Sequence, residues 1–204
     1  MIIEINPENI DRRLIEDVVG VLKKGGIIIF PTDTVYSMGC DLFNKKALNE
    51  LARLKDIKLS KANFSIICHD LSDISDYVKQ IDRPTFKLLK QSLPGPFTFI
   101  LNATNEVPRL FDSKKREIGI RIPNNTILME IVKALGNPIA TTSLHNEEDT
   151  IQDYFADPYM IYERYENKVA LVIDGGIGNL DASTVVDCTN GVEIVRQGIG
   201  ILDV

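Results

Sequence analysis

The sequence predicts an α/β fold in a single domain, with a twisted mixed sheet and helices packed around it. Apolar runs typical of buried strands, such as residues 26–30 and 138–143, alternate with segments whose apolar residues recur at helical spacing. Residues 183–198 then form two β-rich runs around Asn190-Gly191, a dipeptide that favours a tight hairpin turn. Because a terminal hairpin follows strands that alternate with helices, the sheet is expected to be mixed rather than purely parallel.

Helices are expected where apolar residues recur every three to four positions. In residues 6–26 this spacing joins Ile10, Leu14 and Val18, and Gly25-Gly26 supplies a stop signal. The same reasoning predicts further helices at 44–55, 83–93 and 125–138. Strands are expected at residues 26–30, 63–70, 97–103, 117–123, 138–143 and 168–176.

Size and composition indicate an ordinary globular protein. The chain has 204 residues, of which 44% are hydrophobic and 25% charged, and it shows no repeat, low-complexity tract or linker. One domain spanning residues 1–204 is therefore expected. The formal net charge of −6 indicates that the surface as a whole is not built to bind nucleic acid, although a local basic patch is compatible with it.

Cysteine and histidine usage indicates a reducing compartment and no metal site. Cys40, Cys68 and Cys188 are far apart in the sequence and form no CxxC pair, and the histidines are His69 and His145. The cysteines and His69 are expected to have no role in the chemistry. The start of the chain lacks a signal-peptide pattern, and no stretch approaches the ~18 apolar residues of a membrane span. We therefore expect a cytoplasmic protein without membrane contact.

Two clusters of polar side chains follow predicted buried strands. They contribute Thr32, Thr34 and Tyr36 from "PTDTVYS", and Thr141, Ser143 and His145 from "TTSLHN". A turn needs one or two such residues, so their number calls for another explanation. Ligands in open α/β sheets bind beyond the carboxyl ends of the strands. We expect both clusters to face one cavity.

Cationic side chains point to an anionic ligand. The segment "RLKDIKLSK" contains Lys55, Lys58 and Lys61 at a helix end, where cations are also favourable without any ligand. Arg121 alternates with isoleucines inside a strand, and a guanidinium in such a place usually has a specific anionic partner. Both interpretations of the lysine segment stay open at this point.

Glycine-rich signals are weaker. No P-loop or dinucleotide fingerprint occurs. "DGGIGN", residues 174–179, either offers backbone amides to an anion or forms a plain turn. "PGP", residues 94–96, fixes a backbone corner and so aims Thr98 from the start of the next strand.

Several stretches together resemble a known family. "GGIIIFPTDTVYSMGCD", a lysine-bearing loop, "LPGPFTFIL", "IGIRIP", "STVVD" and "VRQG" occur in this order and cover residues 10 to 200. This combination resembles the YrdC/YciO-like family, to which threonylcarbamoyl-AMP synthases belong. The resemblance implies the YrdC-like fold, with a large, concave and locally basic cavity.

The resemblance also implies a reaction and its participants. The synthases of this family combine L-threonine, bicarbonate and ATP into threonylcarbamoyl-AMP and pyrophosphate, for modification of adenosine 37 in tRNA. ATP is a substrate, and Mg²⁺ is expected on its triphosphate. Contact with tRNA or double-stranded RNA, and a monomer or homodimer, are further expectations.

Site residues are carried over by position. The resemblance implies that Lys55 and Lys61 face phosphate and carbamate and that Ser143 belongs with them in the catalytic set. The substrate-binding residues would be Thr32, Thr34, Tyr36, Thr98, Arg121, Thr141 and His145, with Arg121 at the threonine carboxylate. The nucleotide-binding residues would be Lys55, Lys58, Ser143, Ser183 and Arg196.

Two positions depart from the family pattern. Ile57 replaces the arginine of the lysine loop, with Lys58 beside it, and His145 replaces an asparagine. Both place the chain nearer the YciO-like branch. Two alternatives therefore accompany the synthase hypothesis: a double-stranded RNA-binding module without synthase activity, and a related enzyme that acts on another carbamoyl adenylate.

Overall fold

The computed structural model describes residues 1–144 and 155–202. Its strands are β1 (Ile2–Glu4), β2 (Ile28–Phe30), β3 (Ser37–Asp41), β4 (Ser65–Ile67), β5 (Phe97–Asn102), β6 (Glu117–Arg121), β7 (Ile139–Ser143), β8 (Leu171–Asp174), β9 (Thr184–Asp187) and β10 (Glu193–Arg196). Its α-helices are α1 (Arg12–Lys23), α2 (Lys45–Leu54), α3 (Arg83–Ser92), α4 (Glu106–Phe111), α5 (Thr126–Leu135) and α6 (Pro158–Tyr165). Two 3₁₀ helices, η1 (Leu59–Lys61) and η2 (Leu71–Asp76), complete the described elements.

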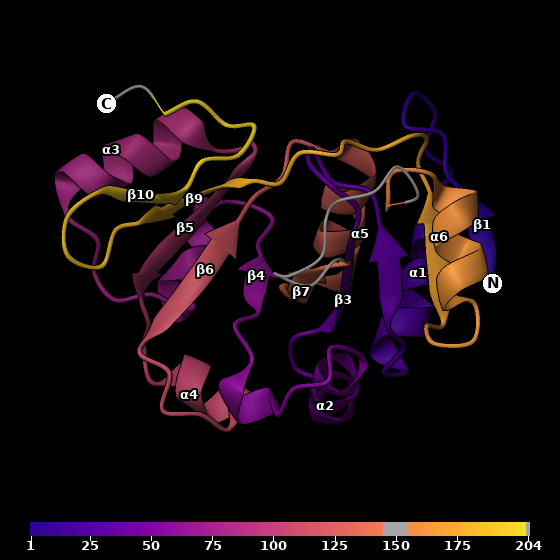
Figure 1. Cartoon of the computed structure of the whole chain (residues 1–204), viewed down its shortest axis with the longest axis horizontal. Helices are drawn as coiled ribbons and strands as arrows, with labels where there is room; N and C mark the ends of the chain where they lie inside the picture. The colour runs from indigo at the N-terminus through magenta and orange to yellow at the C-terminus, as the bar shows by residue number, and fades with distance from the viewer. Residues whose placement is uncertain (145–154, 203–204) are drawn as a thin grey trace.

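The strands of the described residues form one ten-stranded sheet in the order β1-β8-β2-β3-β7-β4-β6-β5-β9-β10. The sheet contains both parallel pairs (β1–β8, β2–β8, β4–β6, β5–β9) and antiparallel ones, so the predicted mixed α/β class is confirmed. Figure 1 shows β1 and β10 at opposite ends of this sheet. The central strands β7, β4 and β6 come from three separate parts of the chain.

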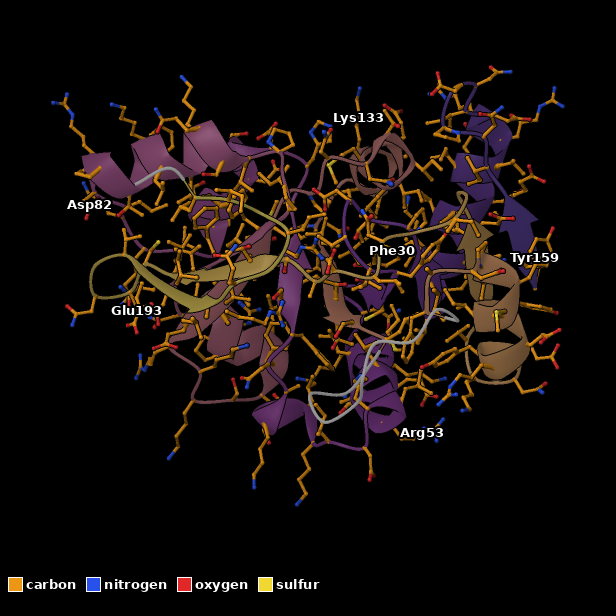
Figure 2. The ribbon with its side chains drawn as sticks, turned by 45° about the horizontal axis from the view of Figure 1, so that its top comes forward. Phe30, Arg53, Asp82, Lys133, Tyr159 and Glu193 are labelled. Carbon is orange, nitrogen blue, oxygen red and sulfur yellow. The ribbon has the colours of Figure 1, made fainter. Side chains whose placement is uncertain are left out.

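The sheet is buried on both faces by two apolar clusters. One contains Met38, Ile66 and Phe99 and packs under α2, α3 and α4. The other contains Phe30 and Ile67 and packs under α1 and α5. Figure 2 shows Phe30 in the interior, whereas labelled charged side chains such as Lys133 and Glu193 point outward. Burial on both faces explains why a strand such as β2 is apolar on both faces.

Capping residues determine where several helices begin and end. Asp11, Asn44 and Asn125 accept backbone N–H groups of the first turns of α1, α2 and α5. Gly136 ends α5 in the left-handed conformation at φ 80°. The predicted helices are present, with shorter bounds. Helix α1, for example, starts only after its capping residue Asp11. In the part of the chain that is described, no helix is long and apolar enough to cross a membrane.

Strand β3 was not predicted, and its presence makes the first polar cluster part of a hairpin. The residues between Phe30 and Ser37 form the loop of a β2–β3 hairpin. A Cβ at Gly39 would lie 2.5 Å from the Ala140 carbonyl oxygen, so glycine lets β3 and β7 approach. The sequence pattern also missed β1, α4 and α6.

The C-terminal hairpin is confirmed, but its turn is not the expected tight one. Strands β9 and β10 pair antiparallel, with Glu193 opposite Asp187. Gly191 has the positive φ that the Asn-Gly dipeptide favours, at 101°. The connection nevertheless runs from 188 to 192, longer than a two-residue turn, and the register shifts between Ile194 and Arg196. This register shift places Arg196 opposite Val185.

Candidate functional site

A polar row crosses one face of the central strands. Thr141 of β7 pairs with Ser65 of β4, and Ser65 pairs with Gly119 of β6. Residues opposite each other in a sheet share a face, so these side chains lie in one row. Ser65 and Gly119 are half-exposed although their strands are central, and so is Ser143 at the end of β7. This part of the face is therefore open to solvent.

Arg121, two residues beyond Gly119, joins β6 to the β2–β3 loop. Its Nη2 donates to Asp33 Oδ1 at 3.2 Å and to Thr34 Oγ1 at 3.1 Å. The Asp33 carboxylate also accepts the backbone N–H of Asn124 at 2.8 Å. Asn179 Nδ2 donates to the Asp33 carbonyl oxygen at 3.1 Å. The anionic partner predicted for Arg121 is thus partly supplied by the protein itself.

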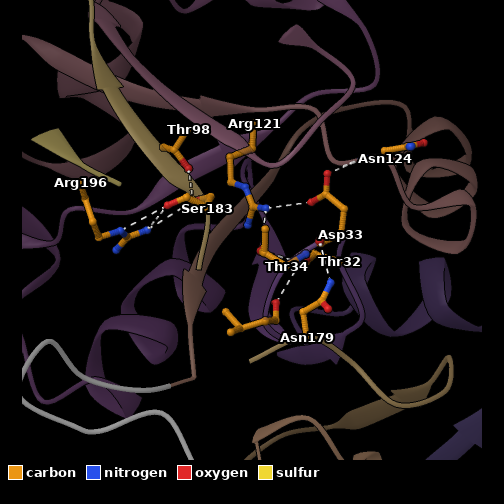
Figure 3. Close-up of polar contacts among 10 residues, drawn as sticks. Thr32, Asp33, Thr34, Thr98, Arg121, Asn124, Asn179, Ser183 and Arg196 are labelled. Atoms are coloured by element: carbon orange, nitrogen blue, oxygen red, sulfur yellow. Dashed lines mark hydrogen bonds and ion pairs between the residues drawn. The ribbon is translucent and has the colours of Figure 1, made fainter. Parts of the chain in front are cut away.

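A second network lies beside the first. Thr98 Oγ1 and Ser183 Oγ are 2.8 Å apart, and Arg196 Nη2 donates to the Ser183 carbonyl oxygen at 2.8 Å. Figure 3 shows this network next to that of Arg121. Thr98 in β5 and Ser183 directly before β9 are both buried. The network therefore holds the Arg196 guanidinium at the polar face.

The two guanidiniums make this region positive. Burial lowers the pKa of Arg121, Asp33 opposes that shift, and the nearby charge of Arg196 lowers the pKa further. Among the described residues, Arg121 Nε is the buried polar side-chain atom that has no hydrogen-bond partner. Two like charges near each other favour an anionic ligand between them.

The threonines of "PTDT" are committed to their own loop. Thr32 Oγ1 donates to the Val35 carbonyl oxygen at 2.9 Å and accepts the Thr34 N–H at 2.9 Å. The two hydroxyl oxygens are 3.0 Å apart, and both side chains are buried. Thr32 and Thr34 therefore shape the hairpin loop and hold Arg121.

Tyr36 ties the hairpin to the "DGGIGN" turn. Its hydroxyl donates to the Gly176 carbonyl oxygen at 2.7 Å and accepts the Gly175 N–H at 3.1 Å. Burial raises the pKa of Tyr36, so the phenol stays protonated. The Gly176 N–H donates to Asp174 Oδ1 at 2.9 Å. Because these amides are used within the protein, the plain-turn interpretation fits this segment.

The same turn lines a separate cavity. This cavity has a volume of about 460 Å³, and Glu4, Asp157, Tyr159 and Asp174 are among the residues that line it. The charged side chains that line it are all acidic, in contrast to the guanidiniums of the polar face. An anionic ligand is therefore better matched by the polar face.

The lysines are placed unequally. Lys55 Nζ donates to the carbonyl oxygens of Ser143 at 3.1 Å and Leu144 at 3.4 Å, which sets its ammonium at the end of β7. Lys58 precedes η1 and Lys61 is its last residue; both side chains are exposed, and neither contacts the polar face within the described residues. His145 lies outside the described residues.

The two threonines of "TTSLHN" point to opposite faces. Thr141 is on the polar face, and its Oγ1 donates to the Met38 carbonyl oxygen at 3.1 Å. Thr142 pairs with Met38 and so lies on the other face. Thr32 and Ser143 belong to neighbouring elements, since Ser143 pairs with Ser37 just after the hairpin loop.

One group of described residues has the composition of a metal site. The ligand atoms of His69, Asp70 and Asp73 lie within 4.8 Å of one another. Asp70 caps η2, and Asp73 Oδ2 accepts the N–H groups of His69 and Asp70. Helix capping accounts for this arrangement, and it is remote in sequence from the polar row.

Four residues of the site were missed by sequence reasoning: Asp33, Ser65, Asn124 and Asn179. Asp33 stands inside the quoted "PTDT" stretch, so its position next to two threonines was a usable signal. Ser65 is a lone serine in an apolar strand, and nothing in its surroundings marks it. Asn124 contributes only a backbone N–H, which carries no sequence signal.

Comparison with models of protein families identifies the family of this chain. The family model named for Sua5, YciO and YrdC, described as "Telomere recombination", matches residues 20–198. The chain belongs to the Sua5/YciO/YrdC family. The predicted resemblance is confirmed.

Curated members of the Sua5/YciO/YrdC family differ in what is known of them. An uncharacterized protein of Haemophilus influenzae is 40% identical over 200 residues, covering 96% of this chain and 94% of that protein. The uncharacterized protein YciO of Escherichia coli is 38% identical over 198 residues, with the same coverage. A threonylcarbamoyl-AMP synthase of Coxiella burnetii is 28% identical over 184 residues, covering 89% and 96%.

Solved structures of the Sua5/YciO/YrdC family share the fold. The crystal structure of E. coli YciO matches with a TM-score of 0.88 at 37% identity, covering 100% of this chain and 98% of that one. The structure of P. abyssi Sua5 complexed with L-threonine matches with a TM-score of 0.85 at 24% identity. That match covers 97% of this chain and 57% of the Sua5 chain.

Proposed function

We propose that this protein is an ATP-dependent synthase of an N-carbamoyl adenylate, with L-threonine, bicarbonate and ATP as substrates. The product would be threonylcarbamoyl-AMP, the activated donor for modification of adenosine 37 in tRNA. The threonylcarbamoyl-AMP synthase of C. burnetii, 28% identical over 89% of the chain, supports this reaction class.

The observation that carries the proposal is the pair of guanidiniums at one open polar face. Burial lowers the pKa of Arg121, and the nearby positive charge of Arg196 lowers it further. The hydroxyls of Thr98 and Ser183 are hydrogen-bonded to each other beside Arg196. Threonine carboxylate, bicarbonate and triphosphate are all anionic, so charge neutralisation and positioning are what the reaction requires.

The proposed steps assign roles to particular groups. Arg121 binds the threonine carboxylate through its guanidinium, which lies at the polar face beside Thr34. The threonine nitrogen attacks the carbon of CO₂ formed from bicarbonate and loses a proton, which gives a carbamate. A carbamate oxygen then attacks the α-phosphorus of ATP, and the bond from that phosphorus to the bridging oxygen breaks.

The leaving group is pyrophosphate, and its charge needs partners. Lys55, whose ammonium lies at the end of β7, and Arg196 are the cations proposed to bind the phosphates. A Mg²⁺ ion would enter on the triphosphate. The carboxylate of Asp33 is already bonded to Arg121 and Asn124. The side chains proposed to contact the phosphates are therefore the cations Lys55 and Arg196.

The lysine loop favours a second candidate. Ile57 is 41% exposed beside Lys58, at the position where the family pattern has an arginine. An apolar side chain there removes a charge-assisted contact to the substrate anions. A related enzyme that forms a carbamoyl adenylate from another amine fits this departure.

The test is direct detection of product. Purified protein is incubated with ATP, Mg²⁺, ¹³C-bicarbonate and either threonine or a panel of other amino acids, and products are analysed by mass spectrometry. We expect an adenylate whose mass includes both the amine and one ¹³C, released with stoichiometric pyrophosphate. Product from another amino acid but not from threonine would favour the second candidate, and no adenylate from any amine would refute both.

A further inference from the structure

The Ser65 hydroxyl lies on the polar face, and nothing in the described part of the protein bonds to it. Ser65 begins β4, a strand between β7 and β6 in the middle of the sheet. Its side chain is half-exposed, and within the described residues its hydroxyl has neither a hydrogen-bond partner nor a buried position. A polar group placed in the floor of an open site without a protein partner is suited to bind a ligand.

Neighbouring hydroxyls are not available in the same way. Those of Thr32 and Thr34 are buried and bonded within the hairpin loop. Those of Thr98 and Ser183 are bonded to each other, and that of Thr141 is bonded to a β3 carbonyl oxygen. Ser65 therefore differs from every one of these in having its donor and acceptor both unused.

Gly119 sets the position of the Ser65 hydroxyl. A Cβ built on Gly119 would lie 2.5 Å from Ser65 Oγ and 3.1 Å from Thr98 Cγ2. The Ser65 side chain thus occupies space above Gly119 that the side chain of any other residue at position 119 would fill. It lies between β7 and β5, on the face that carries Arg121 two residues further along β6.

We propose that Ser65 determines substrate specificity by hydrogen bonding to the side chain of the bound amine. This inference rests on the proposed function, in which Arg121 holds the amino-acid carboxylate. Ile67 pairs with Arg121 and Ser65 with Gly119, so Ser65 is the diagonal neighbour of Arg121. An α-amino acid anchored there has its side chain within reach of Ser65.

The substrate class follows from this contact. A site built to hydrogen-bond a substrate hydroxyl discriminates strongly against an analogue that lacks it. The protein should therefore select an amino acid with a hydroxyl or comparable polar group close to its α-carbon. An aliphatic amino acid of the same shape should be rejected.

Threonine and valine provide the matched ligands, since they have the same shape and differ in the hydroxyl. Binding of each is measured by calorimetry in the presence of a non-hydrolysable ATP analogue, for the native protein, Ser65→Ala and Thr142→Ala. Thr142→Ala removes a hydroxyl from the opposite face of β7 and serves as the control. Binding of the ATP analogue alone and thermal unfolding are recorded for each variant.

We expect the native protein and Thr142→Ala to prefer threonine over valine by at least about tenfold. Ser65→Ala should weaken threonine binding by about tenfold or more, leave valine binding unchanged and so abolish the preference. An unchanged threonine-to-valine ratio in Ser65→Ala, or no binding of either amino acid to the native protein, would overturn the inference. Because binding is measured separately from synthesis, a protein that binds threonine through Ser65 but makes no adenylate would refute only the proposed function.

Discussion

Arg121 and Asp33 form a buried ion pair that joins two distant parts of the chain. Arg121 Nη2 lies 3.2 Å from Asp33 Oδ1, and their side chains are only 7% and 10% exposed. Asp33 belongs to the hairpin loop and Arg121 to the end of β6. The pair therefore fixes the Arg121 guanidinium at the polar face.

Replacing Asp33 with alanine should destabilise the protein by about 3–5 kcal/mol, because a buried guanidinium loses its counter-ion. Urea unfolding measures this change. Glu50→Ala is the matched control, since Glu50 pairs with Arg53 at 2.6 Å on the surface and its loss should cost no more than about 1 kcal/mol. Equal losses in the two variants would show that the Arg121–Asp33 pair contributes little.

Lys115 should make stability depend on pH. Its Nζ donates to the Phe64 carbonyl oxygen at 3.2 Å, and burial lowers its pKa to about 8, with Glu117 opposing the shift. Since the unfolded chain binds more protons between pH 8 and the ordinary lysine pKa near 10.5, the unfolding free energy rises with pH across this window.

Lys115→Met removes this titration. The stability of the native protein relative to Lys115→Met should increase by about 1–3 kcal/mol between pH 8 and pH 10.5. Denaturant unfolding of both proteins at each pH cancels the contribution of other groups. A difference that stays constant with pH would contradict the lowered pKa of Lys115.

Gly119→Ala should disturb the site more than the fold. The new Cβ would displace the Ser65 hydroxyl, because only 2.5 Å separates them. We expect a stability loss of about 1–3 kcal/mol and weaker binding of the amino acid. Gly20→Ala in α1 is the control: its Cβ would meet nothing within 4 Å, and alanine there should stabilise the helix. Unaltered amino-acid binding in Gly119→Ala would indicate that ligands do not approach Ser65.

The departures at Ile57 and His145 predict slow threonine-dependent synthesis. A lost charge-assisted contact to a developing anion raises the barrier by about 2–4 kcal/mol. The double substitution Ile57→Arg and His145→Asn should therefore raise the synthesis rate, by about ten- to a thousandfold. A second double variant, Ile57→Gln with His145→Asn, has no positive charge at residue 57. Comparing its rate with that of the arginine variant tests whether the charge causes the increase. A double variant with arginine that binds ATP yet makes no threonylcarbamoyl-AMP would indicate an amine other than threonine.

The sequence predicted much of the fold because its strands are locally distinct. Apolar runs such as residues 26–30, followed by polar loops and capped helices, are visible without tertiary information. Strand β3 was missed because "SMGCD" neither alternates nor forms an apolar run. It is a strand because β2 and β7 pair with it on both sides, which is a long-range property.

The site was predicted unevenly for the same reason. Thr98, Arg121, Ser183 and Arg196 stand in marked local patterns, and the structure brings them together. Ser65 joins them only through the register of β4 with β6 and β7. The exposed positions of Lys58 and Lys61 likewise depend on how η1 leaves α2, which local sequence does not determine.

The proposed function requires that the face between Arg121 and Arg196 bind the amino acid and the nucleotide together. A crystal structure with threonine, Mg²⁺ and a non-hydrolysable ATP analogue tests it most directly. We predict the threonine carboxylate at Arg121, its hydroxyl within hydrogen-bond distance of Ser65 Oγ, and the phosphates near Arg196 and Lys55. Ligands bound instead in the acidic cavity beside Asp174, with the polar face empty, would contradict the account.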